Sequence, residues 1–327
     1  MVLHKDLENF KALISLTAKD MGILEFYIEK DYWVTYILKK LSSSSFKNDV
    51  VFKGGTSLSK GYNAINRFSE DIDLQLTKSS LGDNQKKKLL KNIEETITEG
   101  MIYLPKHPRE SKRGNIRKTI YQYPIQINEE DKGQVSDVIV LEINSLSTPE
   151  PTEILEIESY IAKYLRKIGK EEFIPQFELE SFKINVLSVK RTFIEKLFAV
   201  LDYTFEENAE VELGNKIRHL YDLHKLYQLE EIKDFLKTED SYKMAFKVVV
   251  QNDFFGKRKD TIYRNSFLYN DFERINKIES VYNTKFKAMV FGEFPDFESL
   301  KDTLKILLDF IDKWEKEYRI EEIKSHN

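Results

Sequence analysis

Residues 52–76 read FKGGTSLSKGYNAINRFSEDIDLQL, and this stretch decides the fold of the chain. Its first residue, Phe52, ends a short apolar run that starts at Val50, and the composition of this run is typical of a β-strand. The stretch ends in residues 72–76, where apolar and polar side chains alternate. Such alternation predicts a second strand with one apolar and one polar face. Asp71 and Asp73 should therefore leave the same face, while the isoleucine and the leucines enter the core.

Two glycines, Gly54 and Gly55, come directly after the first predicted strand. Glycine lets a backbone approach a ligand closely and expose its N–H groups. The hydroxyls of Thr56 and Ser57 add donors, and the short helix predicted over residues 57–65 would aim its N-terminus at an anion. The stretch therefore predicts a phosphate-binding turn, with an ordinary glycine turn as the alternative.

The paired acids predict a metal site, because two carboxylates this close repel each other unless a cation neutralises them. Mg²⁺ usually takes one or two carboxylates together with substrate phosphates. A solvated strand face is the alternative, but it leaves the preceding glycines unexplained. Glu142 interrupts the apolar run Val138 to Asn144, where an unpaired carboxylate is costly. We therefore expect Asp71, Asp73 and Glu142 to bind the metal. Alternatively, Glu142 lies where its strand meets solvent, and Asp137 is the nearest substitute.

The remaining periodicities divide the chain into a strand-rich part and a helical part. Strand signals become rare after Phe182, and we expect a boundary near Pro175. An α+β fold follows, with a mixed-sheet core ahead of a mostly helical half. The predicted helices cover residues 23–41, 86–101, 154–168, 193–203, 216–229 and 300–320, and two further strands cover residues 116–127 and 135–144.

Composition narrows the class of protein. The 327 residues are 41% hydrophobic and carry a net charge of −4, which predicts a sizeable core and no bulk attraction to nucleic acid. The chain has no cysteine, which excludes disulfides, cysteine-ligated zinc fingers and a thiol nucleophile. The polar N-terminal segment and the lack of a long apolar run predict a cytoplasmic protein that does not enter a membrane.

These motifs resemble the signature of the AbiEii/AbiGii toxin family within the nucleotidyltransferase superfamily. The superfamily has a Gly-Gly or Gly-Ser pair after a strand and an acid-x-acid pair on the next strand, which Gly54-Gly55 and Asp71-x-Asp73 match. The lead-in Arg67-Phe68-Ser69-x-Asp71 is similar to the AbiEii form. Further similar segments are Lys30 to Val34, Arg191 to Lys196 and Lys216 to Asp222, so the resemblance spans about Tyr27 to Leu226.

The resemblance implies nucleotidyl transfer from a nucleoside triphosphate to an acceptor, with Mg²⁺ or Mn²⁺ as cofactor. It implies a toxin that a cognate antitoxin protein holds in check, in a toxin–antitoxin or phage abortive-infection system. In several family members the acceptor is tRNA. Residues 1–175 are then expected to form the nucleotidyltransferase core with its N-terminal helices. Residues 176–327 would form a mostly helical domain that completes the nucleotide site.

The segments of the helical half that resemble the family contain three candidate site residues. Lys196 follows an apolar helix face and would reach the β- and γ-phosphates as a point charge, with a solvated lysine as the alternative. Asp222 would orient the nucleotide or hold Lys196 or Arg218. Its alternative role is a structural ion pair with Arg218, one helical turn away. We assign Lys196 and Asp222 to catalysis together with the three acids Asp71, Asp73 and Glu142. We assign Lys196 and Arg218 to nucleotide binding together with residues 54–57.

A run of basic residues lies between residues 106 and 118, ahead of the predicted strand that contains Glu142. Clustered cations beside aromatic residues, here Tyr121 and Tyr123, are typical of a surface that follows an RNA backbone. A solvated loop is the alternative, and residues 257–259 form a second, weaker cluster. We expect tRNA contact through Lys106, Arg109, Lys112, Arg113, Arg117 and Lys118.

Three other functions compete with this interpretation. A metal-dependent nuclease shares the paired acids, but its lysine usually lies beside them on the same strand, where this chain has Leu74 to Leu76. A kinase-like phosphotransferase would share the donor and the metal, but the sequence has neither an HRD-like loop nor a DFG triplet. A catalytically silent binding protein is the third class, and the intact acid pair speaks against it.

Overall fold

The computed structural model describes residues 1–69, 71–77, 80–127, 137–251 and 260–319. The chain folds as two compact units, Met1–Asn63 with Arg67–Leu187 and Ala64–Asn66 with Ser188–Asn327. The first contains a mixed sheet with helices, and the described residues of the second form helices, so the expected α+β class is confirmed. The division falls later than residue 175, because β8 (Phe182–Leu187) is a strand of the sheet.

The sheet of the first unit has both parallel and antiparallel neighbours. Its other strands are β1 (Val50–Lys53), β2 (Ile72–Leu76), β3 (Ile102–Tyr103), β4 (Ser111–Arg113), β5 (Ile116–Gln122), β6 (Val138–Asn144) and β7 (Thr152–Ile157). The strand order is β3-β5-β6-β2-β1-β8-β7, and β4 pairs with β5. β2 is antiparallel to β1 and parallel to β6, while β8 joins β1 in parallel.

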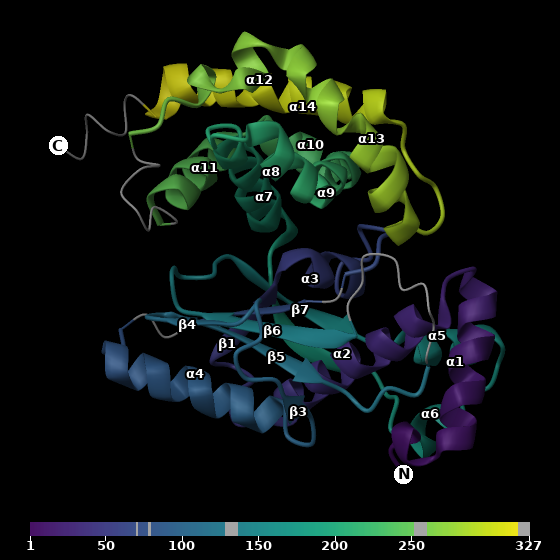
Figure 1. Cartoon of the computed structure of the whole chain (residues 1–327). Helices are drawn as coiled ribbons and strands as arrows, with labels where there is room; N and C mark the ends of the chain where they lie inside the picture. Colours follow the sequence, from purple (N-terminus) through teal and green to yellow (C-terminus); the bar gives the residue numbers. More distant parts are fainter. Residues whose placement is uncertain (70, 78–79, 128–136, 252–259, 320–327) are drawn as a thin grey trace. The chain divides into compact units, whose positions relative to one another are not determined.

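Helices α2 (Glu25–Ser43) and α4 (Asp83–Ile97) pack against each other and against one face of the sheet (Figure 1). Glu94 of α4 accepts a hydrogen bond of 2.5 Å from the hydroxyl of Tyr121 and also pairs with Arg117, so these two β5 residues face α4. Lys118, which alternates with them, projects from the opposite face. The other helices of the unit are α1 (Leu7–Met21), α3 (Gly54–Lys60), α5 (Tyr160–Lys167) and α6 (Phe173–Gln176), with a 3₁₀ turn at Leu3–Lys5.

The alternation of β2 is read correctly from the sequence. Ile72, Leu74 and Leu76 are buried, with at most 1% of their surface exposed. Their burial leaves Asp73 on the face away from α4. β2 begins directly after Asp71, so the two predicted acids flank the first residue of the strand.

Two predicted helices of the first unit are wrong in extent. The periodicity of residues 154–168 predicts one helix, but the structure has the strand β7 followed by α5. Ile157, Ile161 and Leu165 are buried at helical spacing, which explains the misleading period. The pairing of β7 with β8 is a long-range contact that spacing does not reveal. The helix predicted over residues 57–65 begins earlier and ends at Lys60.

Helices make up the regular structure of the described part of the second unit. The helices predicted over residues 193–203, 216–229 and 300–320 are confirmed as α7 (Val189–Tyr203), α9 (Ile217–Tyr227) and α14 (Phe297–Lys313). Phe198 and the buried Trp314 pack with their ring centroids 5.3 Å apart in the core. The other helices are α8 (Ala209–Asn215), α10 (Glu230–Leu236), α11 (Glu239–Gln251), α12 (Phe267–Asn270) and α13 (Glu279–Val281).

Short helical turns complete this unit. They are the 3₁₀ segments Tyr263–Asn265, Phe272–Ile278 and Lys287–Met289 and the π segments Tyr282–Phe286 and Trp314–Arg319. Across the described ranges of both units, every helix is too short or too polar to cross a membrane.

Candidate active site

The glycine turn is formed by Gly54 and Gly55, the first two residues of α3, and the protein's own side chains lie against it. Gly54 has a φ of +81°, a left-handed conformation that favours glycine. A Cβ at Gly54 would overlap Oδ2 of Asp73 and lie 3.0 Å from its Cγ. A Cβ at Gly55 would lie 2.6 Å from Nη2 of Arg67 and 2.9 Å from Oγ of Ser69. The two glycines therefore allow the Asp73 carboxylate and the Arg67 guanidinium to lie against the turn.

Thr56 and Ser57 hold this turn from the inside. Both side chains are buried. Thr56 Oγ1 lies 2.5 Å from the main-chain oxygen of Asp71, to which it donates, and 2.9 Å from Oγ of Ser69. The Ser57 hydroxyl donates to the main-chain oxygen of Gly54 at 2.9 Å. In this arrangement the two hydroxyls fix the turn and the entry to β2. Their contact with a phosphate stays a prediction.

The upstream segment that resembles the family anchors α3. Oδ1 of Asp31, on α2, lies 2.5 Å from Nζ of Lys60 at the end of α3, and both side chains are 3% exposed. Oδ2 of Asp31 accepts the main-chain N–H of Tyr160 at 2.8 Å. Burial lowers the pKa of Lys60, and the neighbouring Asp31 carboxylate partly offsets that effect. One buried carboxylate thus ties the helix after the glycine turn to α2 and to the start of α5.

The three predicted acids come together on one face of the sheet. Asp73 is in register with Glu142 on the neighbouring parallel strand β6. In-register residues of neighbouring strands project from the same face, so β6 places Glu142 beside Asp73. The side chains of Asp71 and Glu142 are 20% and 28% exposed, which makes both accessible without being fully solvated. Asp137 precedes the first residue of β6, and the register favours Glu142 over it.

The electrostatics of this cluster centre on Asp73. Burial raises the pKa of Asp73 to about 7, and repulsion from the Glu142 and Asp71 carboxylates adds to the shift. Lys53 and Lys118 oppose the shift in part. A divalent cation would remove the repulsion among these carboxylates, so the cluster is suited to hold one.

Two cations of the predicted tRNA-binding run lie in the acidic cluster. Nη2 of Arg109 is 3.1 Å from Oδ1 of Asp71, and Nζ of Lys118 is 3.5 Å from Oε2 of Glu142. Lys118 also pairs directly across the β5–β6 ladder with Glu142. These two residues therefore balance the charge of the site carboxylates, a role that sequence reasoning missed because the ion pairs join distant parts of the chain.

The other four cations of the predicted tRNA-binding run do not share one environment either. Lys112 pairs with Glu110 at 2.8 Å and contacts Tyr103, while Arg117 pairs with the buried Glu94 on the face covered by α4. Lys106 and Arg113 remain exposed, and neither side chain forms an ion pair within the described ranges. The run is thus not one continuous free basic surface. The second basic cluster, residues 257–259, lies outside the described residues.

The candidate residues of the second unit form a buried pair. Nζ of Lys196, on α7, lies 2.8 Å from Oδ2 of Asp222, on α9. The exposed fractions of the two side chains are 8% and 0%, so Lys196 is not a solvated lysine. Asp222 pairs with Lys196 instead of with Arg218, which is half-buried and has no ion pair within the described ranges. Arg191, at the start of the same segment, is buried and donates to Glu195 and to Gln251 on α11, each at 3.0 Å.

The acidic cluster fits a divalent metal in its chemistry. Mg²⁺ and Mn²⁺ take carboxylate oxygens, which all three acids supply. As the side chains stand, no group of three His, Asp or Glu in the described part of the chain converges tightly enough to enclose a metal ion. Asp71 and Glu142 instead contact cations of the protein itself, Arg109 and Lys118.

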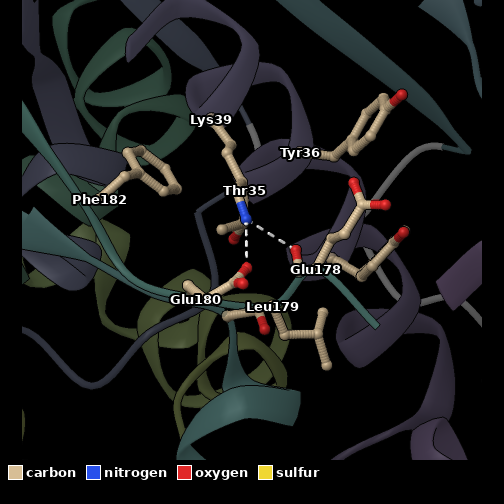
Figure 2. Close-up of a pocket in the computed structure, with 9 residues that line it drawn as sticks. Thr35, Tyr36, Lys39, Glu178, Leu179, Glu180 and Phe182 are labelled. Carbon is tan, nitrogen blue, oxygen red and sulfur yellow. Dashed lines mark hydrogen bonds and ion pairs between the residues drawn. The ribbon is translucent and has the colours of Figure 1, made fainter. Parts of the chain in front are cut away.

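A pocket in the first unit lies apart from these carboxylates (Figure 2). It is lined by Tyr32, Thr35, Tyr36, Lys39, Ser159, Glu178, Leu179, Glu180 and Phe182. The ammonium of Lys39 points into it and donates to the main-chain oxygen of Glu178 at 2.8 Å and to the Glu180 carboxylate at 2.9 Å. The hydrogen bond from Lys39 lowers the pKa of Glu180. The polar groups of this pocket thus link α2 to the segment before β8.

Comparisons with known proteins identify a family and a solved structure that resemble the chain. A family model described as the nucleotidyl transferase AbiEii toxin of type IV toxin–antitoxin systems matches residues 36–306, well beyond Leu226, where the resemblance in motifs ends. Among solved structures, MenT4, a nucleotidyltransferase toxin from Mycobacterium tuberculosis H37Rv, has a similar fold. Its TM-score is 0.56 at 15% sequence identity, over 92% of this chain and 89% of that chain. No curated protein matches the chain by sequence. Because the family model covers most of its length, the chain belongs to the AbiEii family of nucleotidyltransferase toxins.

Proposed function

We propose that the chain transfers a nucleoside monophosphate from a nucleoside triphosphate to an acceptor hydroxyl, with Mg²⁺ or Mn²⁺ held by Asp71, Asp73 and Glu142. The observation that carries this proposal is the register of Asp73 with Glu142 beside the Gly54 turn. Burial and the charges of Glu142 and Asp71 raise the pKa of Asp73, and the positive charge of a bound metal would offset this repulsion among the three acids.

The proposed reaction makes one bond at phosphorus and breaks one. The acceptor hydroxyl oxygen bonds to the α-phosphorus, the bond from that phosphorus to the bridging oxygen breaks, and pyrophosphate leaves. The hydroxyl proton passes to a carboxylate of the site. When bound, the metal supplies charge neutralisation and polarises the α-phosphate. The chain itself fixes the carboxylates through the β2–β6 register and holds the turn through Thr56 and Ser57.

In the first unit, the backbone of Gly54 and Gly55 would supply phosphate contacts beside Asp73. In the second unit, the half-buried guanidinium of Arg218 stays a predicted nucleotide contact. Lys196 is assigned to the phosphates by its position in the lysine-bearing segment, but the structure holds it on Asp222. If Lys196 binds phosphate, its ammonium must leave the Asp222 carboxylate when the nucleotide binds. If it stays on Asp222, the ion pair stabilises the fold of this unit.

The proposed acceptor is tRNA, and the proposed protein partner is a cognate antitoxin. Membership of a type IV toxin–antitoxin family supports the antitoxin. Lys106 and Arg113, which are exposed and flank Arg109 in the sequence, support contact with a polyanion. The test is to incubate the purified protein with Mg²⁺, each of the four α-labelled ribonucleoside triphosphates, and total tRNA. Label on tRNA supports the acceptor. Label only on a protein, or no label in any mixture, contradicts it.

A further inference from the structure

Arg109 lies in the stretch between β3 and β4, and it reaches the acidic cluster from there. Its Nη2 atom is 3.1 Å from Oδ1 of Asp71, and the two side chains are 36% and 20% exposed. Asp73, by contrast, forms no ion pair within the described parts of the chain. Of the two acids of the motif, Asp71 is thus the one whose oxygen a protein cation occupies.

A metal ion at Asp71 would compete with this contact. A divalent cation coordinated to the Asp71 carboxylate would lie a few ångströms from the guanidinium, where the two positive charges repel each other. The carboxylate therefore favours one partner at a time. Lys118 differs from Arg109 because it lies on a strand. Its backbone pairs with that of Glu142 in the β5–β6 ladder, and its ammonium lies 3.5 Å from the Glu142 carboxylate.

The stretch that carries Arg109 is held in place independently of Asp71. Oε2 of Glu110 accepts the main-chain N–H of Lys106 at 3.0 Å, and its other carboxylate oxygen binds Tyr103 and Lys112. The N–H of Arg109 lies 3.2 Å from Nδ1 of His107. If the guanidinium left Asp71, this anchored backbone would keep it beside the site. A guanidinium matches the paired oxygens of a phosphate, so the triphosphate is its natural second partner.

We infer that Arg109 is a nucleotide-binding residue that changes partner. It holds Asp71 while the site lacks metal, and it binds the triphosphate once the metal takes Asp71. This inference rests on the proposed metal site at Asp71 and Asp73. It separates Arg109 from the tRNA-binding run and gives it two opposing effects. Arg109 weakens binding of free metal, and it strengthens binding of the metal–nucleotide complex.

The test measures binding by calorimetry on the full-length chain, without turnover. Mn²⁺ is titrated into the wild type and into Arg109→Ala, Arg109→Lys and Asp71→Asn. Arg166→Ala is the charge-matched control, because it removes a similarly exposed ion pair, that of Arg166 on α5 with Glu158. The α,β-methylene analogues of the four ribonucleoside triphosphates are then titrated at saturating Mn²⁺. Thermal unfolding of each variant verifies its fold.

We expect Arg109→Ala to bind Mn²⁺ about two- to fivefold more tightly than the wild type, the range typical of a partly exposed ion pair. It should bind the preferred analogue about tenfold more weakly, because a charge-assisted contact is lost. Arg109→Lys should fall between Arg109→Ala and the wild type, and Arg166→Ala should match the wild type in both titrations.

Unchanged or weaker Mn²⁺ binding in Arg109→Ala would overturn the inference, and so would unchanged analogue binding. If Asp71→Asn still weakens Mn²⁺ binding in that case, the proposed function stands and only the role of Arg109 fails. If the wild type and Arg109→Ala bind neither Mn²⁺ nor any analogue, both proposals fail together. A folded Arg109→Lys variant keeps the comparison valid should Arg109→Ala unfold.

Discussion

Lys196 and Asp222 form a buried ion pair between α7 and α9, with Nζ and Oδ2 separated by 2.8 Å. At most 8% of either side chain is exposed, so neither charge can be solvated if the other is removed. Breaking a buried pair by removing one partner usually costs about 3–5 kcal/mol, whereas removing both partners costs much less. The pair therefore allows a structural role of these residues to be separated from a catalytic one.

Asp222→Asn should lower the free energy of unfolding by about 3 kcal/mol, because it removes the negative charge that faces the buried Lys196 ammonium. The double variant Lys196→Met/Asp222→Leu should recover most of that loss. Urea denaturation measures both. Lys243→Ala, which removes an exposed pair with Glu239, is the control and should change stability by less than about 1 kcal/mol. Wild-type stability in Asp222→Asn, together with a raised KM for the nucleotide, would assign the pair to substrate binding instead.

Gly54→Ala should cost more stability than Gly100→Ala. Both glycines have a positive φ, +81° and +86°, so both substitutions carry the same backbone strain, about 1 kcal/mol. A Cβ at Gly100 meets nothing within 4 Å, whereas one at Gly54 overlaps the Asp73 carboxylate. The difference between the two variants in urea denaturation reports that overlap. Equal losses would mean that the turn does not need to admit the Asp73 side chain.

The acidic cluster should make the metal-free protein less stable as pH rises. The pKa of Asp73 is about 7 in the folded chain against an ordinary value of 3.8, so the folded state retains a proton that the unfolded chain has lost. The free energy of unfolding therefore falls as pH rises from about 3.8 to about 7, and the full loss is present above about pH 7. Asp73→Asn should flatten this part of the pH profile, measured by urea denaturation with a chelator. Glu142→Gln should flatten it partly, by removing a repelling charge. Profiles parallel to that of the wild type would contradict the assignment.

Much of the first unit could be predicted from local patterns. The alternation of residues 72–76 predicts β2, its buried face and the common face of its acids, because a period of two is a local property. β7 and β8 were not predicted, because their pairing joins segments whose own patterns are weak. The helical spacing of Ile157 and Ile161 outweighed the strand signal there. The boundary between the units was consequently placed ahead of the last strand.

The candidate site was predictable in its acids but not in their partners. Asp71, Asp73 and Glu142 stand out as carboxylates on or beside apolar strands. The ion pairs with Arg109 and Lys118 depend on strand order and loop course, so the sequence showed these residues only as part of a basic run. Arg218 lies one helical turn from Asp222 and was the local choice of partner, but the packing of α7 on α9 brings Lys196 there instead.

If tRNA is the acceptor, the exposed cations Lys106 and Arg113 should contribute to its binding. Lys106→Ala/Arg113→Ala should weaken tRNA affinity and reduce the slope of log affinity against log salt by about 1 for each cation that contacts phosphate. Filter binding across a series of salt concentrations measures the slope. Lys11→Ala/Lys19→Ala, which removes two exposed lysines of α1, is the charge-matched control. If both double variants weaken tRNA binding equally, the loss reflects net charge alone, and specific contact through Lys106 and Arg113 is contradicted.

The most direct test of nucleotidyl transfer compares the fate of the α- and γ-phosphates of one nucleoside triphosphate. The purified chain is incubated with Mg²⁺, tRNA and the preferred nucleotide, labelled in parallel reactions at the α- or the γ-phosphorus. The account predicts that α-label joins the acceptor and γ-label leaves as pyrophosphate, and that Asp73→Asn abolishes both outcomes while remaining folded. Transfer of γ-label to the acceptor, or α-label transfer that persists in Asp73→Asn, would contradict it.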